Sequence, residues 1–426
     1  MSASARESFF QLSDTSVDVR NSVLGSLASL LEENKAEIFD ANARDLAAAE
    51  KENLASPLLH RLAFGGEKLK QVIEGLHSLI RLPDPLNHTL FANEITEGLR
   101  LYRVTCPIGV IGVIFESRPD ALIQISALCI KSGNAVILKG GREAAHTNHI
   151  LCDLVRRSLV SAGLPADSAQ LLDTREEVAQ MLKEDRLIDL IIPRGSNHFV
   201  RYIMDNSRIP VLGHADGLCH VYVDAEADPD MAVSLVTDSK TQNVSVCNAA
   251  ETLLVHRDIA SAFLPAAAES LSKAGVEIRG DAETRELISC IPATEDDWSS
   301  EYLDYIISIR IVSSVDEAID HINHFGSHHT DSIVTRNAAT AAAFMQRVDS
   351  AGVYWNVSTR FADGYVYGLG AEVGIATGKI HARGPMGLEG LTTYKYKLIG
   401  NGHTMSEMKN GVRQYSHRPL NEDCPF

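Results

Sequence analysis

The chain has 426 residues, of which 45% are hydrophobic and 22% are charged. This length exceeds the ~250 to 300 residues at which one hydrophobic core usually stops growing, so a single small module is excluded. The formal charge of −17 leaves no broad basic surface, which argues against nucleic acid and anionic membrane as partners. Any ligand that carries phosphate must then be held by local arginines, lysines and backbone N–H groups.

The N-terminus and the cysteines indicate the cellular compartment, and the C-terminus suggests a flexible end. The N-terminus has no long apolar segment, and no stretch of ~18 consecutive apolar residues follows, so we expect a cytoplasmic protein. The seven cysteines are scattered without a CxxC pair, which predicts free thiols rather than a disulfide framework or a zinc site. Residues 413–426 are polar and contain proline, and we expect them to form a loose tail.

In the first hundred residues the apolar pattern changes from helical to β-like. Between residues 17 and 82 apolar side chains recur at helical spacing, as in Leu24, Leu27 and Leu31. Residues 95–97 and 101–104 are then two β-like runs on either side of Gly98, which predicts a hairpin. A similar β-rich run spans residues 391–398.

From residue 108 onward short apolar runs alternate with helical stretches. Such alternation is typical of parallel sheets with crossover helices, in which ligands bind at the carboxyl ends of the strands. We therefore expect an α/β fold with two doubly wound domains. The first would have strands at 110–115, 135–139, 169–172, 187–192 and 220–223, with helices near 122–132 and up to 161. The second, from residue 231 to 376, would have strands at 252–255, 306–312, 331–335 and 352–355.

Two glycine-containing segments follow predicted strands of the first domain, Lys139-Gly-Gly-Arg142 and Pro193-Arg-Gly-Ser-Asn197. A glycine lets the backbone approach a phosphate, and the next helix N-terminus supplies N–H donors. Lys139 and Arg142 are candidates for the 2′-phosphate of NADP, and Gly195 and Ser196 are candidates for phosphate contacts. Neither segment has the G-x-G-x-x-G pattern, so ordinary turn chemistry is an open alternative.

Cys247 is the candidate nucleophile. It lies in the polar stretch Thr241-Gln-Asn-Val-Ser-Val-Cys-Asn-Ala-Ala250, just before a predicted strand. A thiolate in a partly exposed loop is reactive, whereas most cysteines are inert buried thiols, and the local sequence alone favours the inert thiol.

Histidines gather in the run His321-Ile-Asn-His324-Phe-Gly-Ser-His328-His329. No cysteine or glutamate accompanies them at the spacing of a zinc motif, so we expect no metal site. Histidines of this kind can instead bind a substrate phosphate or cap a helix, and His329 is the candidate substrate contact.

Several segments in the same order along the chain resemble the aldehyde dehydrogenase superfamily, and within it the gamma-glutamyl phosphate reductase family. The resemblance covers nearly the whole chain and implies an NADPH-binding domain, a catalytic domain and a β-flap that mediates homo-oligomerisation. The segments that carry it are residues 107–119, 139–143, 245–249, 301–304, 355–361 and 382–388. It places the NADPH-binding domain at residues 1–90 and 107–225 and the catalytic domain at residues 226–383. The flap would comprise residues 91–106 and 384–412, and the tail residues 413–426.

The resemblance also implies roles for single residues. It makes Cys247 the nucleophile, Lys139 the contact to the adenosine ribose and Glu301 the residue that holds the nicotinamide ribose. Arg118 lies near the family's oxyanion-stabilising amide, although the spacing differs there, and Asn248 is a second candidate for the oxyanion. Arg360 is a candidate contact for a substrate carboxylate or phosphate, with a structural ion pair as the alternative.

One departure from the superfamily pattern bears on the reaction. Members that oxidise aldehydes to acids carry a glutamate base in a Glu-Leu-Gly-Gly segment, and the matching stretch here reads Val211-Leu-Gly-His214. Without that base, water attacks a thioester poorly. This fits an enzyme in which phosphate, and not water, is the group that exchanges with the cysteine sulfur on the acyl carbon.

The reaction that the resemblance implies is NADPH-dependent reduction of L-glutamyl 5-phosphate to L-glutamate 5-semialdehyde, a step of proline biosynthesis. The thioester would form on Cys247 as phosphate leaves. Glutamate 5-kinase, which makes the acyl phosphate, is then a candidate partner. Two alternatives are open: a dehydrogenase that oxidises another aldehyde, and a catalytically silent nucleotide-binding protein with the same fold.

Overall fold

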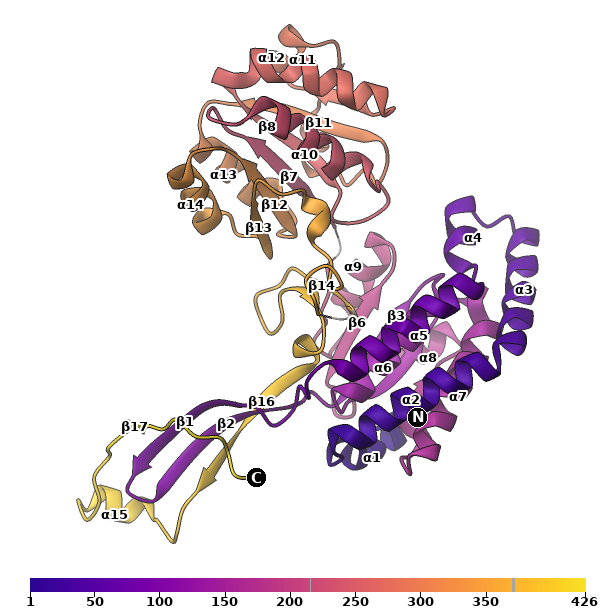
Figure 1. The fold of residues 1–426 in the computed structure, drawn as a ribbon, viewed down its shortest axis with the longest axis vertical. Helices are drawn as coiled ribbons and strands as arrows, with labels where there is room; N and C mark the ends of the chain where they lie inside the picture. The colour runs from indigo at the N-terminus through magenta and orange to yellow at the C-terminus, as the bar shows by residue number, and fades with distance from the viewer. Residues whose placement is uncertain (215, 370–371) are drawn as a thin grey trace.

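The computed structural model describes residues 1–214, 216–369 and 372–426, and its chain folds into two α/β units and a long flap (Figure 1). Five helices come first; the last four lie in the range 17–82, where the helical spacing predicted them, and the first precedes that range. Ser16 caps the second of them by accepting a hydrogen bond from the Val19 N–H at 3.4 Å, and Leu24, Leu27 and Leu31 of the same helix are fully buried. The five are α1 (Ser2–Ser13), α2 (Val17–Glu33), α3 (Lys35–Lys51), α4 (Ser56–Leu62) and α5 (Gly66–Arg81).

The first sheet has four parallel strands in the order β5-β4-β3-β6, so the predicted crossover topology is confirmed. Its strands are β3 (Val110–Phe115), β4 (Ala135–Lys139), β5 (Ala169–Leu171) and β6 (Leu190–Arg194). Its helices are α6 (Pro119–Lys131), α7 (Ala145–Ser161), α8 (Arg175–Met181) and α9 (Asn197–Asn206). Strand β6 begins three residues later than predicted because Leu187 and Ile188 close a turn onto the Glu184 carbonyl, each at 2.9 Å.

The second sheet has seven parallel strands in the order β10-β9-β11-β8-β7-β12-β13. The strands are β7 (Cys219–Val223), β8 (Ala250–His256), β9 (Glu277–Gly280), β10 (Ile291–Pro292), β11 (Ile306–Val312), β12 (Thr330–Val334) and β13 (Gly352–Trp355). The helices are α10 (Pro229–Thr241), α11 (Arg257–Lys273), α12 (Ala282–Leu287), α13 (Val315–Phe325) and α14 (Ala338–Arg347).

Strand β7 corrects one predicted boundary. The sequence placed it in the first domain, but it pairs with β8 and β12 of the second sheet. All five of its residues are buried, as expected of a central strand covered on both faces. The first α/β unit therefore ends before Cys219, whereas the sequence placed its end at residue 225.

The flap is an antiparallel sheet with the order β16-β2-β1-β17, and it projects from the two α/β units (Figure 1). Its strands are β1 (Thr89–Thr96), β2 (Leu99–Pro107), β16 (Thr392–Ile399) and β17 (Arg418–Pro419). The predicted hairpin is confirmed, and Gly98 at its turn has a φ of +75°, which glycine adopts without steric cost.

The expectation of a loose tail at residues 413–426 is wrong. Strand β17 pairs with β1, the Leu420 N–H donates to the Ala92 carbonyl at 3.0 Å, and the Cys424 N–H donates to Thr89 Oγ1 at 2.8 Å. The tail thus satisfies backbone groups that the edge strand β1 would otherwise expose. Before it lies the short helix α15 (Met405–Lys409).

The predicted flap segment 384–412 also begins too early. Strand β15 (Gly384–Met386) pairs instead with β14 (Gly374–Ala376) in a separate two-stranded sheet. Across the described part of the chain, no helix combines the length and apolar character that crossing a membrane requires.

Candidate active site

Cys247 lies in the turn that joins α10 to β8, and its side chain is half-buried. The Thr359 hydroxyl donates to the Asn248 carbonyl at 2.7 Å and so fixes the backbone beside the thiol. Gly217 packs directly against the same backbone, because a Cβ added there would lie 2.5 Å from Cys247 Cα. Only glycine allows so close an approach.

A buried ion pair joins the two ends of the turn that carries Cys247. Lys240 Nζ, at the end of α10, lies 2.6 Å from Glu251 Oε2, at the start of β8, and both side chains are at most 1% exposed. Burial lowers the pKa of Lys240 and raises the pKa of Glu251, and their mutual attraction opposes both shifts. The Leu303 N–H donates to the second carboxylate oxygen at 3.3 Å, so the pair also anchors the segment that contains Glu301.

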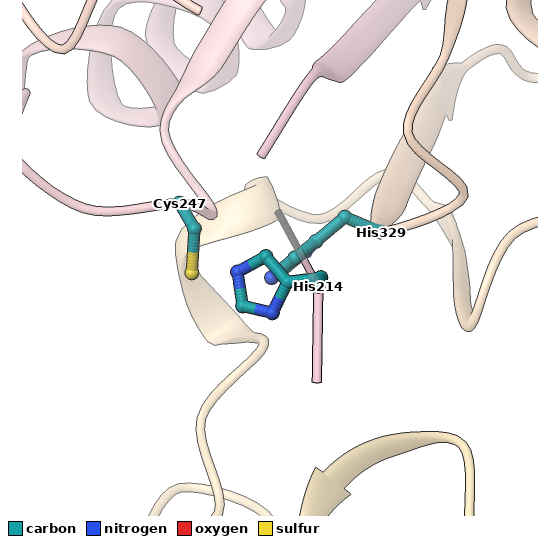
Figure 2. A group of neighbouring side chains, drawn as sticks. All are labelled: His214, Cys247 and His329. Atoms are coloured by element: carbon teal, nitrogen blue, oxygen red, sulfur yellow. The ribbon is translucent and has the colours of Figure 1, made fainter. Parts of the chain in front are cut away.

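Two histidines from other elements meet Cys247, as Figure 2 shows. One ligand atom each of His214, Cys247 and His329 lie within 4.8 Å of one another, and the two imidazole rings are 5.0 Å apart in an edge-to-face arrangement. His214 Nδ1 is 2.8 Å from the Ile375 carbonyl, which only accepts, so Nδ1 carries the proton and Nε2 has a free lone pair. Burial lowers the pKa of His214, which favours the neutral ring.

His329 is the one residue of the histidine run that reaches the thiol. Its side chain is 1% exposed, Nδ1 lies 3.0 Å from Thr330 Oγ1, and Nε2 has no hydrogen-bond partner among the described residues. His321 packs edge-on against Trp298, and burial lowers its pKa to about 2. His328 binds the Asp349 carbonyl at 2.6 Å.

The segment that replaces the superfamily's glutamate base has an arrangement that the sequence did not predict. Val211 forms a parallel bridge with Ile191 and packs against an apolar cluster. His214, three residues later, reaches Cys247 instead. Spacing within the sequence could not reveal this, because the three partners come from separate elements.

The two oxyanion candidates are held by other partners. The Asn248 side chain is buried, and its Nδ2 donates to the Ala362 carbonyl at 2.9 Å. Arg118 precedes α6 and forms an ion pair with Asp120 at 2.8 Å. Asn248 therefore serves to hold the neighbouring loop, and Arg118 faces a cavity rather than the sulfur.

This cavity of about 760 Å³ lies between α5, α6 and the loop after η4 (Thr359–Phe361). Charges of both signs line it, among them those of Arg118, Arg194, Asp363 and Glu372. Arg194 ends strand β6, and its guanidinium is 3.9 Å from Glu372. Cys247 is not part of the lining.

Two guanidinium groups lie within electrostatic reach of the thiol. Burial lowers the pKa of both Arg194 and Arg360, and the charge of Cys247 opposes the shift in each case. Arg360 also donates from Nε to Gln242 Oε1 at 2.8 Å. The sequence singled out Arg360, but for residues 193–197 it named Gly195 and Ser196 and missed Arg194.

The cofactor candidates lie at the carboxyl edge of the first sheet. Lys139 ends β4, where its Nζ donates to the Gly140 carbonyl, and Arg142 is well exposed and pairs with Glu52 at 2.9 Å. Ser196 precedes α9, and its N–H donates to Glu116 Oε2 at 3.2 Å. A Cβ at Gly195 would lie 2.7 Å from the same oxygen, so the backbone is tightly packed there.

Glu301 connects the cofactor unit with the catalytic turn. Asn197, at the start of α9, donates to its carboxylate, as does the Gly217 N–H. Burial raises the pKa of Glu301, while these two donors and His214 oppose the shift. Because Gly217 also packs on Cys247, a ligand group held by Glu301 would lie beside the thiol.

The chain is similar to proteins of known class. The family model described as the aldehyde dehydrogenase family matches residues 1–286. The gamma-glutamyl phosphate reductase of Pelotomaculum thermopropionicum is 56% identical over 418 residues, which are 98% of this chain and 96% of that protein. The protein of the same name from Acetivibrio thermocellus is 55% identical over 426 residues, 100% of this chain and 99% of the relative.

Solved structures agree with these similarities. The gamma-glutamyl phosphate reductase of Thermotoga maritima superposes with a TM-score of 0.93 at 40% identity, covering 95% of this chain and 98% of that one. A propionaldehyde dehydrogenase from Clostridium phytofermentans has a TM-score of 0.65 at 16% identity, covering 95% and 97% of the two chains, which shows the common fold alone.

Proposed function

Because the chain belongs to the gamma-glutamyl phosphate reductase family of the aldehyde dehydrogenases, we propose that it reduces L-glutamyl 5-phosphate to L-glutamate 5-semialdehyde with release of phosphate, in proline biosynthesis. The observation that carries this proposal is the contact of Gly217 with both Cys247 and Glu301. It joins a half-buried thiol to the residue that would hold the nicotinamide ribose.

Cys247 would act as the nucleophile. Its thiolate forms a bond with the acyl carbon, and the bond from that carbon to the phosphate oxygen breaks, which leaves a thioester and free phosphate. Arg194 and Arg360 lie within electrostatic reach of the thiol, so they would stabilise the leaving phosphate. The unpartnered Nε2 of His329 would contact the substrate's reacting end.

The cofactor candidates fit a dinucleotide. NADPH, when bound, supplies the hydride that reduces the thioester. Glu301 would offer a carboxylate to ribose hydroxyls, and Gly195 and Ser196 directly precede helix α9, whose N-terminus would face a phosphate. Lys139 and Arg142 are two cations at the edge of the same sheet, where a 2′-phosphate would distinguish NADPH from NADH.

The cavity that Arg118 and Arg194 line would bind the amino-acid end of the substrate. A glutamyl group carries a carboxylate and an ammonium on the same carbon, and the lining pairs Arg118 and Arg194 with Asp363 and Glu372. Each ligand charge would thus find an opposite protein charge at one end of the cavity. The reacting carbon, at the other end of the substrate, would reach Cys247.

The flap would form the contact between protomers. Its edge strand β16 exposes Tyr394, Tyr396 and Leu398, each at least 50% exposed, next to unpaired backbone groups. Such an edge is a template for pairing with a second copy of the chain. We also assign the protein to the cytoplasm, because all seven of its cysteines are free thiols and such thiols persist in reducing compartments.

The reverse reaction tests the function. With L-glutamate 5-semialdehyde and NADP, formation of NADPH should require added phosphate or arsenate, because the thioester needs an acceptor other than water. Turnover without either anion would instead indicate an aldehyde dehydrogenase that hydrolyses its thioester. Binding of NADPH with no thiol-dependent turnover would indicate a catalytically silent protein.

A further inference from the structure

We propose that Cys247, His214 and His329 form a binding site for Zn²⁺ in the enzyme without substrate, and that the bound ion reversibly blocks the catalytic thiol. The proposal rests on the proposed function only in that a blocked thiol cannot be acylated. No role for the metal in turnover is implied.

The three side chains have the composition of a tetrahedral zinc site, and their ligand atoms lie somewhat farther apart than such a site requires. Zinc binds cysteine sulfur at ~2.3 Å and histidine nitrogen at ~2.0 to 2.1 Å, which places ligand atoms about 3.3 to 3.6 Å apart. Here the three ligand atoms already lie within 4.8 Å of one another. A pair of ligand atoms at that limit would therefore have to close by about 1.2 to 1.5 Å when the ion binds.

The histidines present free lone pairs to the thiol. Because His214 Nδ1 donates to the Ile375 carbonyl, Nε2 is the metal-binding atom. His329 Nε2 has no partner among the described residues, although the side chain is 1% exposed. A buried imidazole nitrogen without a partner is costly, and a metal ion would satisfy it.

The ligand types determine which ions bind. A thiolate with two imidazoles favours Zn²⁺ and Co²⁺ over the oxygen-seeking ions Mg²⁺ and Ca²⁺. On binding, the sulfur–hydrogen bond of Cys247 is replaced by a sulfur–zinc bond, and the proton passes to solvent without any change in oxidation state. Three protein ligands leave a fourth position for water.

Binding of zinc and acylation exclude each other, because both use the same sulfur lone pair. Zn²⁺ should therefore inhibit competitively with the acyl phosphate, and the acylated enzyme should not bind the ion. By mass action, the substrate would protect the thiol from zinc to the same extent that zinc protects it from the substrate.

The test is a titration of the reduced full-length protein with Co²⁺, in the absence of substrate and chelators. We expect a near-ultraviolet thiolate-to-cobalt band that saturates at one ion per chain, whereas Mg²⁺ should produce none. Cys247→Ser should remove this band, and His214→Ala and His329→Ala should each weaken binding by tenfold or more. His149→Ala is the matched control, since His149 is exposed and pairs with Asp173 at the surface.

A second measurement needs no variant. Zn²⁺ should slow alkylation of Cys247 by iodoacetamide in the wild-type protein, followed by peptide mass spectrometry, and EDTA should restore the original rate. Absence of the cobalt band, its full retention in both histidine variants, or alkylation that Zn²⁺ does not slow would each overturn the proposal. Reductase activity measured with EDTA on the same preparation tests the enzymatic function separately.

Discussion

The buried pair of Lys240 and Glu251 closes the turn that carries Cys247, and the change Lys240→Met tests what this pair contributes. Both side chains are at most 1% exposed, and the charged atoms are 2.6 Å apart. Methionine has a similar length but no charge, so the variant leaves the Glu251 carboxylate buried without its cation. Removing one partner of a buried pair costs ~3 to 5 kcal/mol, and we expect a loss of unfolding free energy in that range.

The double variant Lys240→Met/Glu251→Leu is the control. It replaces the pair by apolar side chains and leaves only the Leu303 N–H without its carboxylate, which costs about 1 kcal/mol. The double variant should therefore be more stable than either single variant, with a coupling energy of at least about 3 kcal/mol. If the two single losses simply add in the double variant, the pair does not hold the turn.

The assay is urea unfolding followed by tryptophan fluorescence. Trp298 and Trp355 are the only two tryptophans of the chain, and both lie in the catalytic unit. Their signal therefore reports on the unit that contains the pair, even where the cofactor unit unfolds separately. A change of less than about 1 kcal/mol in Lys240→Met would refute the assigned cost.

Four further changes test the site and the flap. Cys247→Ser should abolish reduction, because the serine hydroxyl is a much weaker nucleophile, while a fluorescence titration should still show NADPH binding. Retained turnover would contradict the thioester mechanism. Gly217→Ala places a Cβ 2.5 Å from the Cys247 backbone and should lower kcat by roughly 100-fold, so a wild-type kcat would contradict the assigned packing. Lys139→Ala should raise the KM for NADPH by about 10-fold or more and leave that for NADH unchanged, since only NADPH has the extra phosphate; equal effects on both would remove the 2′-phosphate role. Tyr396→Glu should shift the protein to smaller species in analytical ultracentrifugation, whereas the exposed control Val160→Glu should not; an unchanged mass would place the protomer contact elsewhere.

The local elements of the fold were largely predictable, but the assignment of strands to sheets was not. The ranges of β3, β4, β11 and β13 match the predicted ones, because each is a short β-rich run with clear breaks around it. The run at β7 has the same local character, and only its pairing with β8 and β12 assigns it to the second sheet. Strand β17 has two residues and polar neighbours in the sequence, so no local pattern predicts a strand there.

For the site, the sequence predicted the candidate nucleophile but not its surroundings. The ordered motifs led to Cys247, whereas His214 and Arg194 reach the site through the folding of separate elements. Asn248 was proposed from its position next to the cysteine, yet its amide turns into the protein to bind the Ala362 carbonyl. Neighbouring residues in a turn can point in different directions, so adjacency alone does not predict a shared role.

The order of strands in the flap has a consequence for synthesis of the chain. Strands β1 and β2 leave the ribosome early, but their partners β16 and β17 follow about 300 residues later. At ~5 to 20 residues per second the hairpin waits roughly 15 to 60 s for its outer strands, and an isolated hairpin is at best marginally stable. The proposed contact between protomers can therefore be completed only on finished chains, and truncation of the last dozen residues should expose the edge of β1 to aggregation.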